Sequence, residues 1–170
     1  SLQVAQAIDY AEFNGARVIN MSFGDSDVNL FGDVLVTTAA TSAFANGVVI
    51  VAAAGNNSND TKYYPAALEN VIAVAATDAK DERASFSNFG GWVSVAAPGL
   101  DVLSTTLGGG YQNVSGTSIS APYVAGLASL LLAKDPLLTP SDVRLRIEYS
   151  IQNISPDFPL GSGRVNAFNA

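Results

Sequence analysis

Ser118 is the residue whose type and surroundings point most directly to chemistry. It follows Gly116 and Thr117 and opens a run, 119–133, in which nearly every residue is apolar. A run that is apolar on all sides predicts a buried helix, with Thr117 as its N-cap and Ser118 in its first turn. Unpaired N–H groups and the positive end of the helix dipole favour negative charge there. Ser118 is therefore a candidate nucleophile beside a place where an oxyanion would be stabilised.

Pro122 breaks a local rule inside the same predicted helix. It stands four residues after Ser118, so it has no N–H to donate to the Ser118 carbonyl, and its ring crowds that carbonyl. Such violations tend to mark functional sites. Gly-Thr-Ser is by itself a common turn sequence, so the catalytic interpretation depends on the residues around it.

Asn56 is the second candidate. A valine-rich run, 47–54, is apolar on both faces, which is typical of a strand buried in a parallel sheet, and Gly55 and Asn56 end it. Functional groups of open parallel sheets gather beyond the carboxyl ends of the strands, so the amide of Asn56 could donate to an oxyanion. The alternative is an ordinary turn asparagine bonded to its own backbone.

The elements that would hold these two residues alternate along the chain. This alternation favours an α/β fold in which helices flank a parallel β-sheet, within one domain. Helices are expected over 1–16, 28–46, 119–133 and 140–151; strands are expected over 18–22, 47–54, 71–76 and 92–97, with a hairpin over 102–114 around Gly108 to Gly110.

Composition excludes several classes of function. The 170 residues are 48% hydrophobic and include eight basic and fifteen acidic residues, so the formal charge is -7 and no basic cluster could follow a phosphate backbone. Nucleic acid is therefore not an expected partner. The run 119–133 is too short and too broken to span a membrane, and the N-terminus shows no signal segment from which export could be read.

The chain contains neither cysteine nor histidine. The first absence excludes disulfides and thiolate metal sites. The second matters more, because a serine nucleophile normally needs a base within hydrogen-bond reach, and histidine is the usual base. Lys134 cannot replace it, since sixteen helical residues would separate its position from Ser118 by roughly 24 Å.

The longer string around Ser118 is specific. Ser-Gly-Thr-Ser-x-x-x-Pro-x-Val-Ala-Gly, residues 115–126, resembles the nucleophile motif of the subtilisin-like serine proteases, with Ile119, Ser120 and Tyr123 as departures. Ala-Ala-Ala-Gly-Asn, ending at Asn56, resembles the oxyanion-hole segment of that family. Further segments, thermitase-like in character, extend the resemblance over essentially the whole chain; they are 64–67, 71–74, 83–90, 97–99 and 163–167.

The resemblance implies a serine endopeptidase with the C-terminal portion of a subtilisin-like three-layer sandwich. Ser118 would be the nucleophile, and Asn56 would stabilise the oxyanion. The strand end at Ser22, Phe23 and Gly24 would pair with an extended polypeptide substrate, and Ala53, Ala54 and Gly55 would form one wall of the pocket for the residue before the scissile bond.

In this family the triad runs Asp, His, Ser along the chain, and the sequence begins, by resemblance, just after the first two. Residues 1–170 would then be an incomplete peptidase domain that is inactive alone. Its expected partner is the missing N-terminal half or a second copy, because strand 18–22 would become a sheet edge. The resemblance also implies a secreted or extracytoplasmic protein.

No cofactor is required by the resemblance. In some relatives backbone carbonyls matching Ala66, Leu68 and Val71, with a carboxylate matching Asp78, hold a weakly bound cation, such as calcium or sodium. The alternative for Asp78 is a solvated turn residue.

Two other functions stay open. One is a pseudoprotease or peptide-binding module that keeps the groove without catalysis, and the presence of both Ser118 and Asn56 argues against it. The other is a serine hydrolase that is not a protease. It is disfavoured because Ser120 stands where the Gly-x-Ser-x-Gly elbow needs its last glycine. Sedolisins share Gly-Thr-Ser but have an aspartate in place of Asn56.

Overall fold

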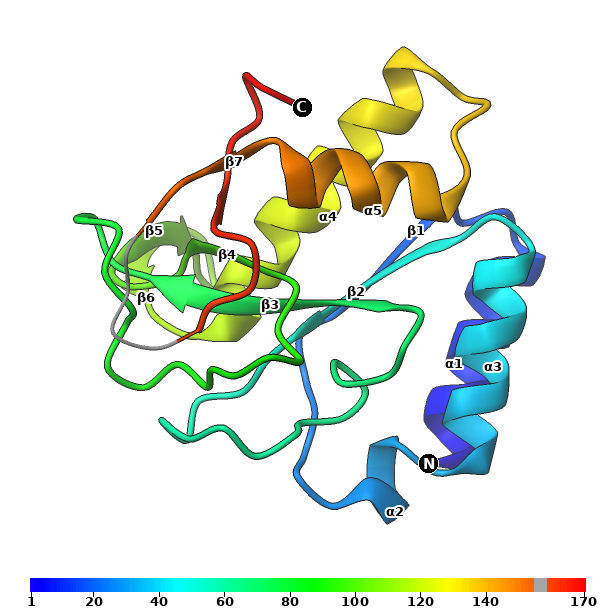
Figure 1. Ribbon diagram of the computed structural model, residues 1–170. Coiled ribbons are helices and arrows are strands. Elements are labelled where there is room, and N and C mark those ends of the chain that lie inside the picture. Colours follow the sequence, from blue (N-terminus) through cyan, green and yellow to red (C-terminus); the bar gives the residue numbers. More distant parts are fainter. Residues whose placement is uncertain (155–158) are drawn as a thin grey trace.

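A six-stranded sheet forms the centre of the molecule in the computed structural model, which describes residues 1–154 and 159–170 (Figure 1). The strand order is β1-β2-β3-β4-β8-β7; neighbours from β1 to β8 pair in parallel, and β7 pairs with β8 antiparallel. The expected α/β fold with a mainly parallel sheet is confirmed. The strands are β1 (Val18–Met21), β2 (Val49–Ala53), β3 (Val71–Thr77), β4 (Val95–Pro98), β7 (Ile151–Gln152) and β8 (Arg164–Val165).

Helices cover both faces of this sheet. In Figure 1, α1 (Leu2–Phe13) and α3 (Val34–Ala45) lie together on one side, and α4 (Thr117–Lys134) and α5 (Pro140–Tyr149) lie on the other. Every residue of β2 and β3 is buried, as expected for strands covered on both faces.

Successive residues of β2 contribute to opposite layers of the core. Val49, Val51 and Ala53 pack with α4 and α5, whereas Ile50 and Ala52 pack with α1 and α3. This alternation follows from the two-residue period of a strand. The apolar run 47–54 is therefore one strand shared by two hydrophobic layers.

The helix expected over 28–46 is wrong in one respect, because it is two helices. Gly32 ends α2 (Val28–Phe31), and Asp33 caps α3 by accepting a hydrogen bond from the N–H of Val36 at 3.0 Å. A Cβ on Gly32 would lie 2.5 Å from the ring of Tyr64. Because Gly32 has no Cβ, the ring of Tyr64 can lie against the backbone at the break.

The strand expected over 92–97 begins later, at Val95. Trp92 lies in a turn, and its indole N–H donates to the carbonyl of Asp60 at 3.0 Å. The predicted hairpin is confirmed as β5 (Val102–Thr105) and β6 (Tyr111–Val114), which pair antiparallel.

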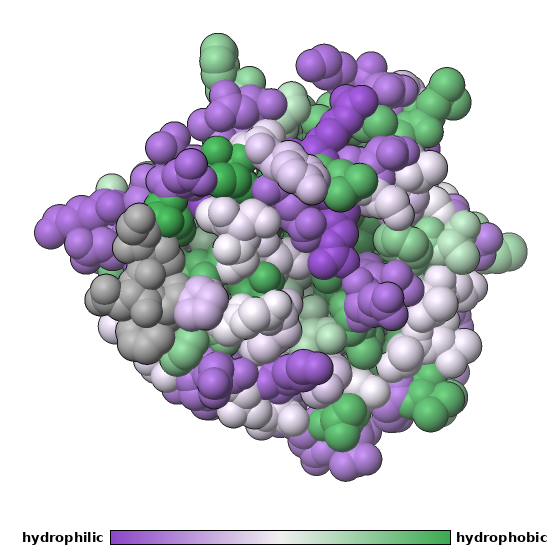
Figure 2. Space-filling model, viewed as in Figure 1, coloured by the Kyte–Doolittle hydropathy of each residue, from purple (hydrophilic) through white to green (hydrophobic). Residues whose placement is uncertain are grey.

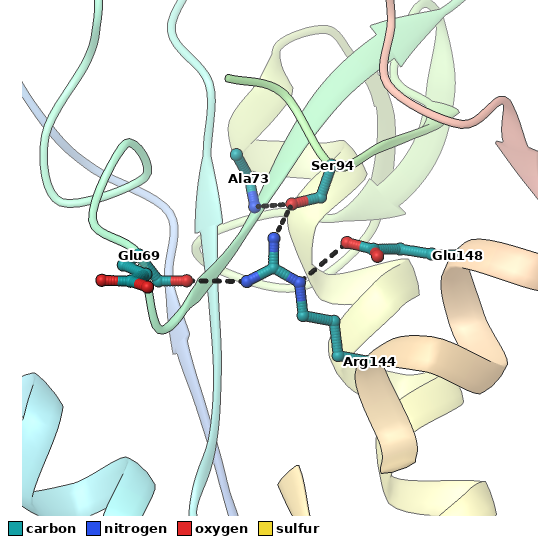
Figure 3. Close-up of polar contacts among 5 residues, drawn as sticks. All are labelled: Glu69, Ala73, Ser94, Arg144 and Glu148. Atoms are coloured by element: carbon teal, nitrogen blue, oxygen red, sulfur yellow. Dashed lines mark hydrogen bonds and ion pairs between the residues drawn. The ribbon is translucent and has the colours of Figure 1, made fainter. Parts of the chain in front are cut away.

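Arg144 joins α5 to the sheet (Figure 3). Its guanidinium pairs with Glu148 at 2.8 Å, and it donates to the carbonyl of Glu69 at 2.7 Å and to Ser94 Oγ at 3.2 Å. Ser94 Oγ also accepts from the N–H of Ala73 in β3. The network ties the helix to the segments that precede β3 and β4.

The surface is mixed in character. Figure 2 shows hydrophobic side chains scattered among hydrophilic ones on the face of Figure 1. Within residues 1–154 and 159–170, no helix is long and apolar enough to cross a membrane.

Candidate active site

The first turn of α4 lies beside the carboxyl ends of β1 and β2. Ser22 follows β1 and contacts Ser118, and Asn56 follows β2 and contacts Thr117. Parallel pairing brings these two strand ends to one edge of the sheet, the edge at which open α/β sheets bind ligands. The fold thus brings together two residues expected to be catalytic and one expected to bind substrate.

The amide of Asn56 is held by its carbonyl oxygen. Its Oδ1 accepts from the N–H of Thr117 at 2.9 Å and from Thr117 Oγ1 at 3.0 Å. Thr117 Oγ1 in turn accepts from the N–H of Gly55 at 3.0 Å. Because the oxygen is committed to Thr117, the two N–H groups of the amide are left to serve as donors on its other side.

Thr117 is therefore not the N-cap of α4, as the sequence suggested. The N-cap is Gly116, and Thr117 is the first helical residue, fully buried. Its hydroxyl binds Asn56 and Gly55 instead of capping the helix. The partners lie about sixty residues away along the chain, so local capping rules could not identify them.

Gly116 keeps open the space shared by Ser118 and Asn56. A Cβ on this residue would lie 2.9 Å from Ser118 Oγ and 3.6 Å from Asn56 Nδ2, so both groups border the same small volume. Its φ of +151° is also one that side chains rarely adopt. A hydroxyl nucleophile and an amide donor around one open space can attack a carbonyl and stabilise the resulting oxyanion.

Ser22 was expected to act through its backbone, but its side chain also takes part. Ser22 Oγ donates to the carbonyl of Ser118 at 2.8 Å, and Asn20 Nδ2 donates to Ser22 Oγ at 2.9 Å. The only signal in the sequence was Pro122, which leaves that carbonyl without its usual helical donor.

Tyr63 lies between two segments expected to bind substrate. Its ring would be 2.9 Å from a Cβ on Gly24 and 2.9 Å from a Cβ on Gly55, so it occupies the slot between these glycines. The backbones of Asp25 and Tyr64 exchange two hydrogen bonds, at 2.9 and 2.8 Å, which hold the ring there. Burial, and secondarily the charge of Asp25, raise the pKa of Tyr63.

The other substrate-binding candidates are placed as follows. Ala53 and Ala54 are buried in the core, so they could line a pocket only with their backbone. Phe23 is 45% exposed, and its ring centroid lies 5.6 Å from that of Phe31 in α2. Phe23 therefore extends the edge of the site toward α2.

The structure does not bring the four cation candidates together. Asp78 lies just beyond the end of β3, whereas Val71 begins it, so roughly 20 Å separates them. Asp78 Oδ1 accepts from the N–H groups of Lys80 and Glu82, as a turn residue does. The described residues contain no group of three or more His, Cys, Asp or Glu that could hold a metal. Cation binding at Asp78 stays a prediction from the resemblance.

The family model for the subtilase family matches residues 1–163. This chain belongs to the subtilase family. It is 45% identical over 171 residues to a thermophilic serine proteinase from Bacillus sp. (strain AK1), and 41% identical over 167 residues to subtilisin DY from Bacillus licheniformis. These alignments cover 98% and 96% of this subtilase chain but only 40% and 60% of the two relatives.

Solved structures give the same result. The prenylagaramide maturation protease PagA matches with a TM-score of 0.89 and 32% identity, over 99% of this chain and 65% of its own. The patellamide maturation protease PatA matches with a TM-score of 0.89 and 35% identity, over 99% and 66%. The chain is thus part of a subtilase domain, and the relatives are serine proteases. The resemblance expected from the Ser118 motif is confirmed.

Proposed function

We propose that the subtilase containing this chain is a serine endopeptidase, with Ser118 as nucleophile and Asn56 as oxyanion donor. The observation that carries the proposal is the orientation of Asn56. Its oxygen is fixed by Thr117, and its Nδ2 borders the same open space as Ser118 Oγ. Family membership supports peptide hydrolysis, and the geometry supports the roles of the two side chains.

In this mechanism Ser118 Oγ forms a bond to the peptide carbonyl carbon, and the hydroxyl proton passes to a base. The carbonyl π electrons move to oxygen, which Asn56 Nδ2 and the N–H groups of the first turn of α4 stabilise. When the tetrahedral intermediate collapses, the carbon–nitrogen bond breaks, the amine leaves with a proton, and Ser118 carries the acyl group. Water then releases the acid and restores the hydroxyl.

The base lies outside residues 1–170, since these contain no histidine. We propose that an Asp and a His in a preceding segment complete the triad, and that residues 1–170 are the C-terminal part of one peptidase domain. Alone, the chain would be inactive, and its partner would be that segment or a second copy. No cofactor is needed, and the resemblance favours a secreted or extracytoplasmic protein.

The substrate is an extended polypeptide. The backbone of Ser22, Phe23 and Gly24 continues beyond β1 and can pair with such a chain, a mode that tolerates many sequences. The side chain before the scissile bond would then lie beside Gly55, where the ring of Tyr63 limits the room for it.

Hydrolysis of casein by the full-length protein and its Ser118→Ala variant tests this proposal. We expect Ser118→Ala to lower kcat by at least about 10³-fold. Ser129→Ala, which removes an exposed-face hydroxyl of the same helix, should stay close to wild type. Equal turnover in Ser118→Ala would overturn the proposal, and peptide binding without turnover in the wild type would indicate a pseudoprotease.

A further inference from the structure

The backbone around Ser118 is held from two strands. The N–H of Thr117 donates to Asn56, which follows β2, and the carbonyl of Ser118 accepts from Ser22, which follows β1. These two peptide groups lie on either side of the residue that the proposed function makes the nucleophile. The helix alone does not supply the second contact, because residue 122, whose N–H would normally donate to the Ser118 carbonyl, is a proline and has no N–H.

The contact from Ser22 is itself supported. Asn20 Nδ2 donates to Ser22 Oγ at 2.9 Å, and Ser22 Oγ donates to the Ser118 carbonyl at 2.8 Å. The hydroxyl therefore accepts through one lone pair and donates its proton in one directed chain, which fixes the rotation of the hydroxyl. Such chains are also mutually strengthening.

We propose that Ser22 is a positioning residue for the nucleophile, and that Pro122 makes it necessary. Pro122 removes the helical N–H that would hold the Ser118 carbonyl, and the hydroxyl of Ser22 takes its place from β1. The Ser118 backbone is thereby held in a fixed position relative to the end of β1, which would bind substrate. This inference rests on the proposed function, because it presumes that Ser118 attacks the peptide bond.

Loss of the Ser22 hydroxyl should lower the catalytic rate and leave substrate binding nearly unchanged. Ser22 touches the backbone of Ser118, and substrate would pair with the main chain of Ser22, which a side-chain substitution leaves in place. A displacement of about 1 Å of a reacting group can cost up to about 10²-fold in rate. We therefore expect Ser22→Ala to lower kcat about 10-fold with little change in KM.

The test uses the full-length protein with a chromogenic peptide substrate. Ser22→Ala is compared with Ser22→Thr, which keeps the hydroxyl and should recover most of the lost kcat. The matched control is Ser129→Ala, because Ser129 Oγ also donates to a carbonyl of α4, that of Ala125, at 2.9 Å but away from the site. Thermal unfolding of each variant separates loss of fold from loss of rate.

Substitution of Pro122 tests whether the Ser22 hydroxyl is needed because the proline lacks an N–H. Pro122→Ala restores an N–H opposite the Ser118 carbonyl, so the kcat loss caused by Ser22→Ala should be smaller in the Pro122→Ala background. If Ser22→Ala behaves like Ser129→Ala, or if Ser22→Ala raises KM with kcat unchanged, the inference is wrong. Those outcomes differ from failure of the proposed function, in which Ser118→Ala would retain activity.

Discussion

Asn56 shows how one side chain can be oriented by a single neighbour. Its oxygen accepts two hydrogen bonds from Thr117. Its Nδ2 group therefore faces the space that Gly116 leaves open beside Ser118. The sequence predicted both Ser118 and Asn56 from their motifs. It could not predict the contacts of Thr117 and Ser22, whose partners lie 61 and 96 residues away along the chain.

Asn56→Ala in the full-length protein should lower kcat by about 10²–10³-fold, the range known for this kind of donor in a subtilisin. KM should change little, since the donor acts mainly in the transition state. Asn56→Asp is the informative companion, because it can still accept from Thr117 but has no N–H to donate. Steady-state kinetics would contradict the assignment if Asn56→Asp retained wild-type kcat.

If the proposed function holds, Tyr63 should influence which substrates are cleaved. Its ring fills the slot between Gly24 and Gly55. We therefore expect the proposed enzyme to prefer a small side chain before the scissile bond. In Tyr63→Gly, kcat/KM for a phenylalanine substrate should rise relative to an alanine substrate by at least about 10-fold. An unchanged ratio in a folded variant would show that the ring of Tyr63 does not limit the substrate side chain.

Among the elements, the sequence predicted the strands from β1 to β6 but not the two short strands β7 and β8, and it extended helix α5 to Ile151, which lies in β7. β2 and β3 are buried on both faces, so composition alone identified them. At the division between α2 and α3 the ring of Tyr64 lies against Gly32, and the late start of β4 follows a turn in which Trp92 binds Asp60. These contacts are tertiary and leave little trace in local periodicity.

Helix α5 begins at residue 140, as the sequence predicted, with Thr139 as its N-cap and Pro140 as its first residue. The Thr139 hydroxyl, and then its N–H, hold the pKa of Asp142 below its ordinary value of 3.8. The folded state therefore gains stability above about that pH, and loses it as the pH falls through the lower pKa of the folded state.

Thermal unfolding between pH 2 and pH 7 tests the role of this cap. Thr139→Val removes the hydroxyl at nearly constant shape, so it should lower Tm at pH 7 and have a smaller effect at pH 2. Thr139→Ser, which keeps the hydroxyl, should follow the wild type. The same loss of Tm at both pH values would show that the ionised carboxylate contributes nothing to the cap.

At the scale of the whole molecule, β1 lies at an end of the sheet. Among the residues that the structure describes it pairs only with β2. Asn20 is its one exposed residue, and the strand contains no charged side chain. An uncovered apolar edge recruits another strand. We expect purified residues 1–170 to associate, with a preceding segment when it is supplied or with a second copy when it is not.

Light scattering over a range of concentrations measures this association. A preceding segment added in trans should replace self-association with a one-to-one complex. A stable monomer at high concentration, with residues 18–22 protected from hydrogen exchange, would contradict an open edge at β1.

In the proposed mechanism Ser118 is a nucleophile whose base lies outside residues 1–170. Covalent labelling with a fluorophosphonate, followed by mass spectrometry of the digested protein, tests this role of Ser118. We predict rapid labelling of Ser118 in the full-length protein and none above background in isolated residues 1–170, because the base is missing there. Labelling of a different residue in the full-length protein would show that Ser118 is not the nucleophile, and equal labelling of Ser118 in both proteins would show that no outside base is needed.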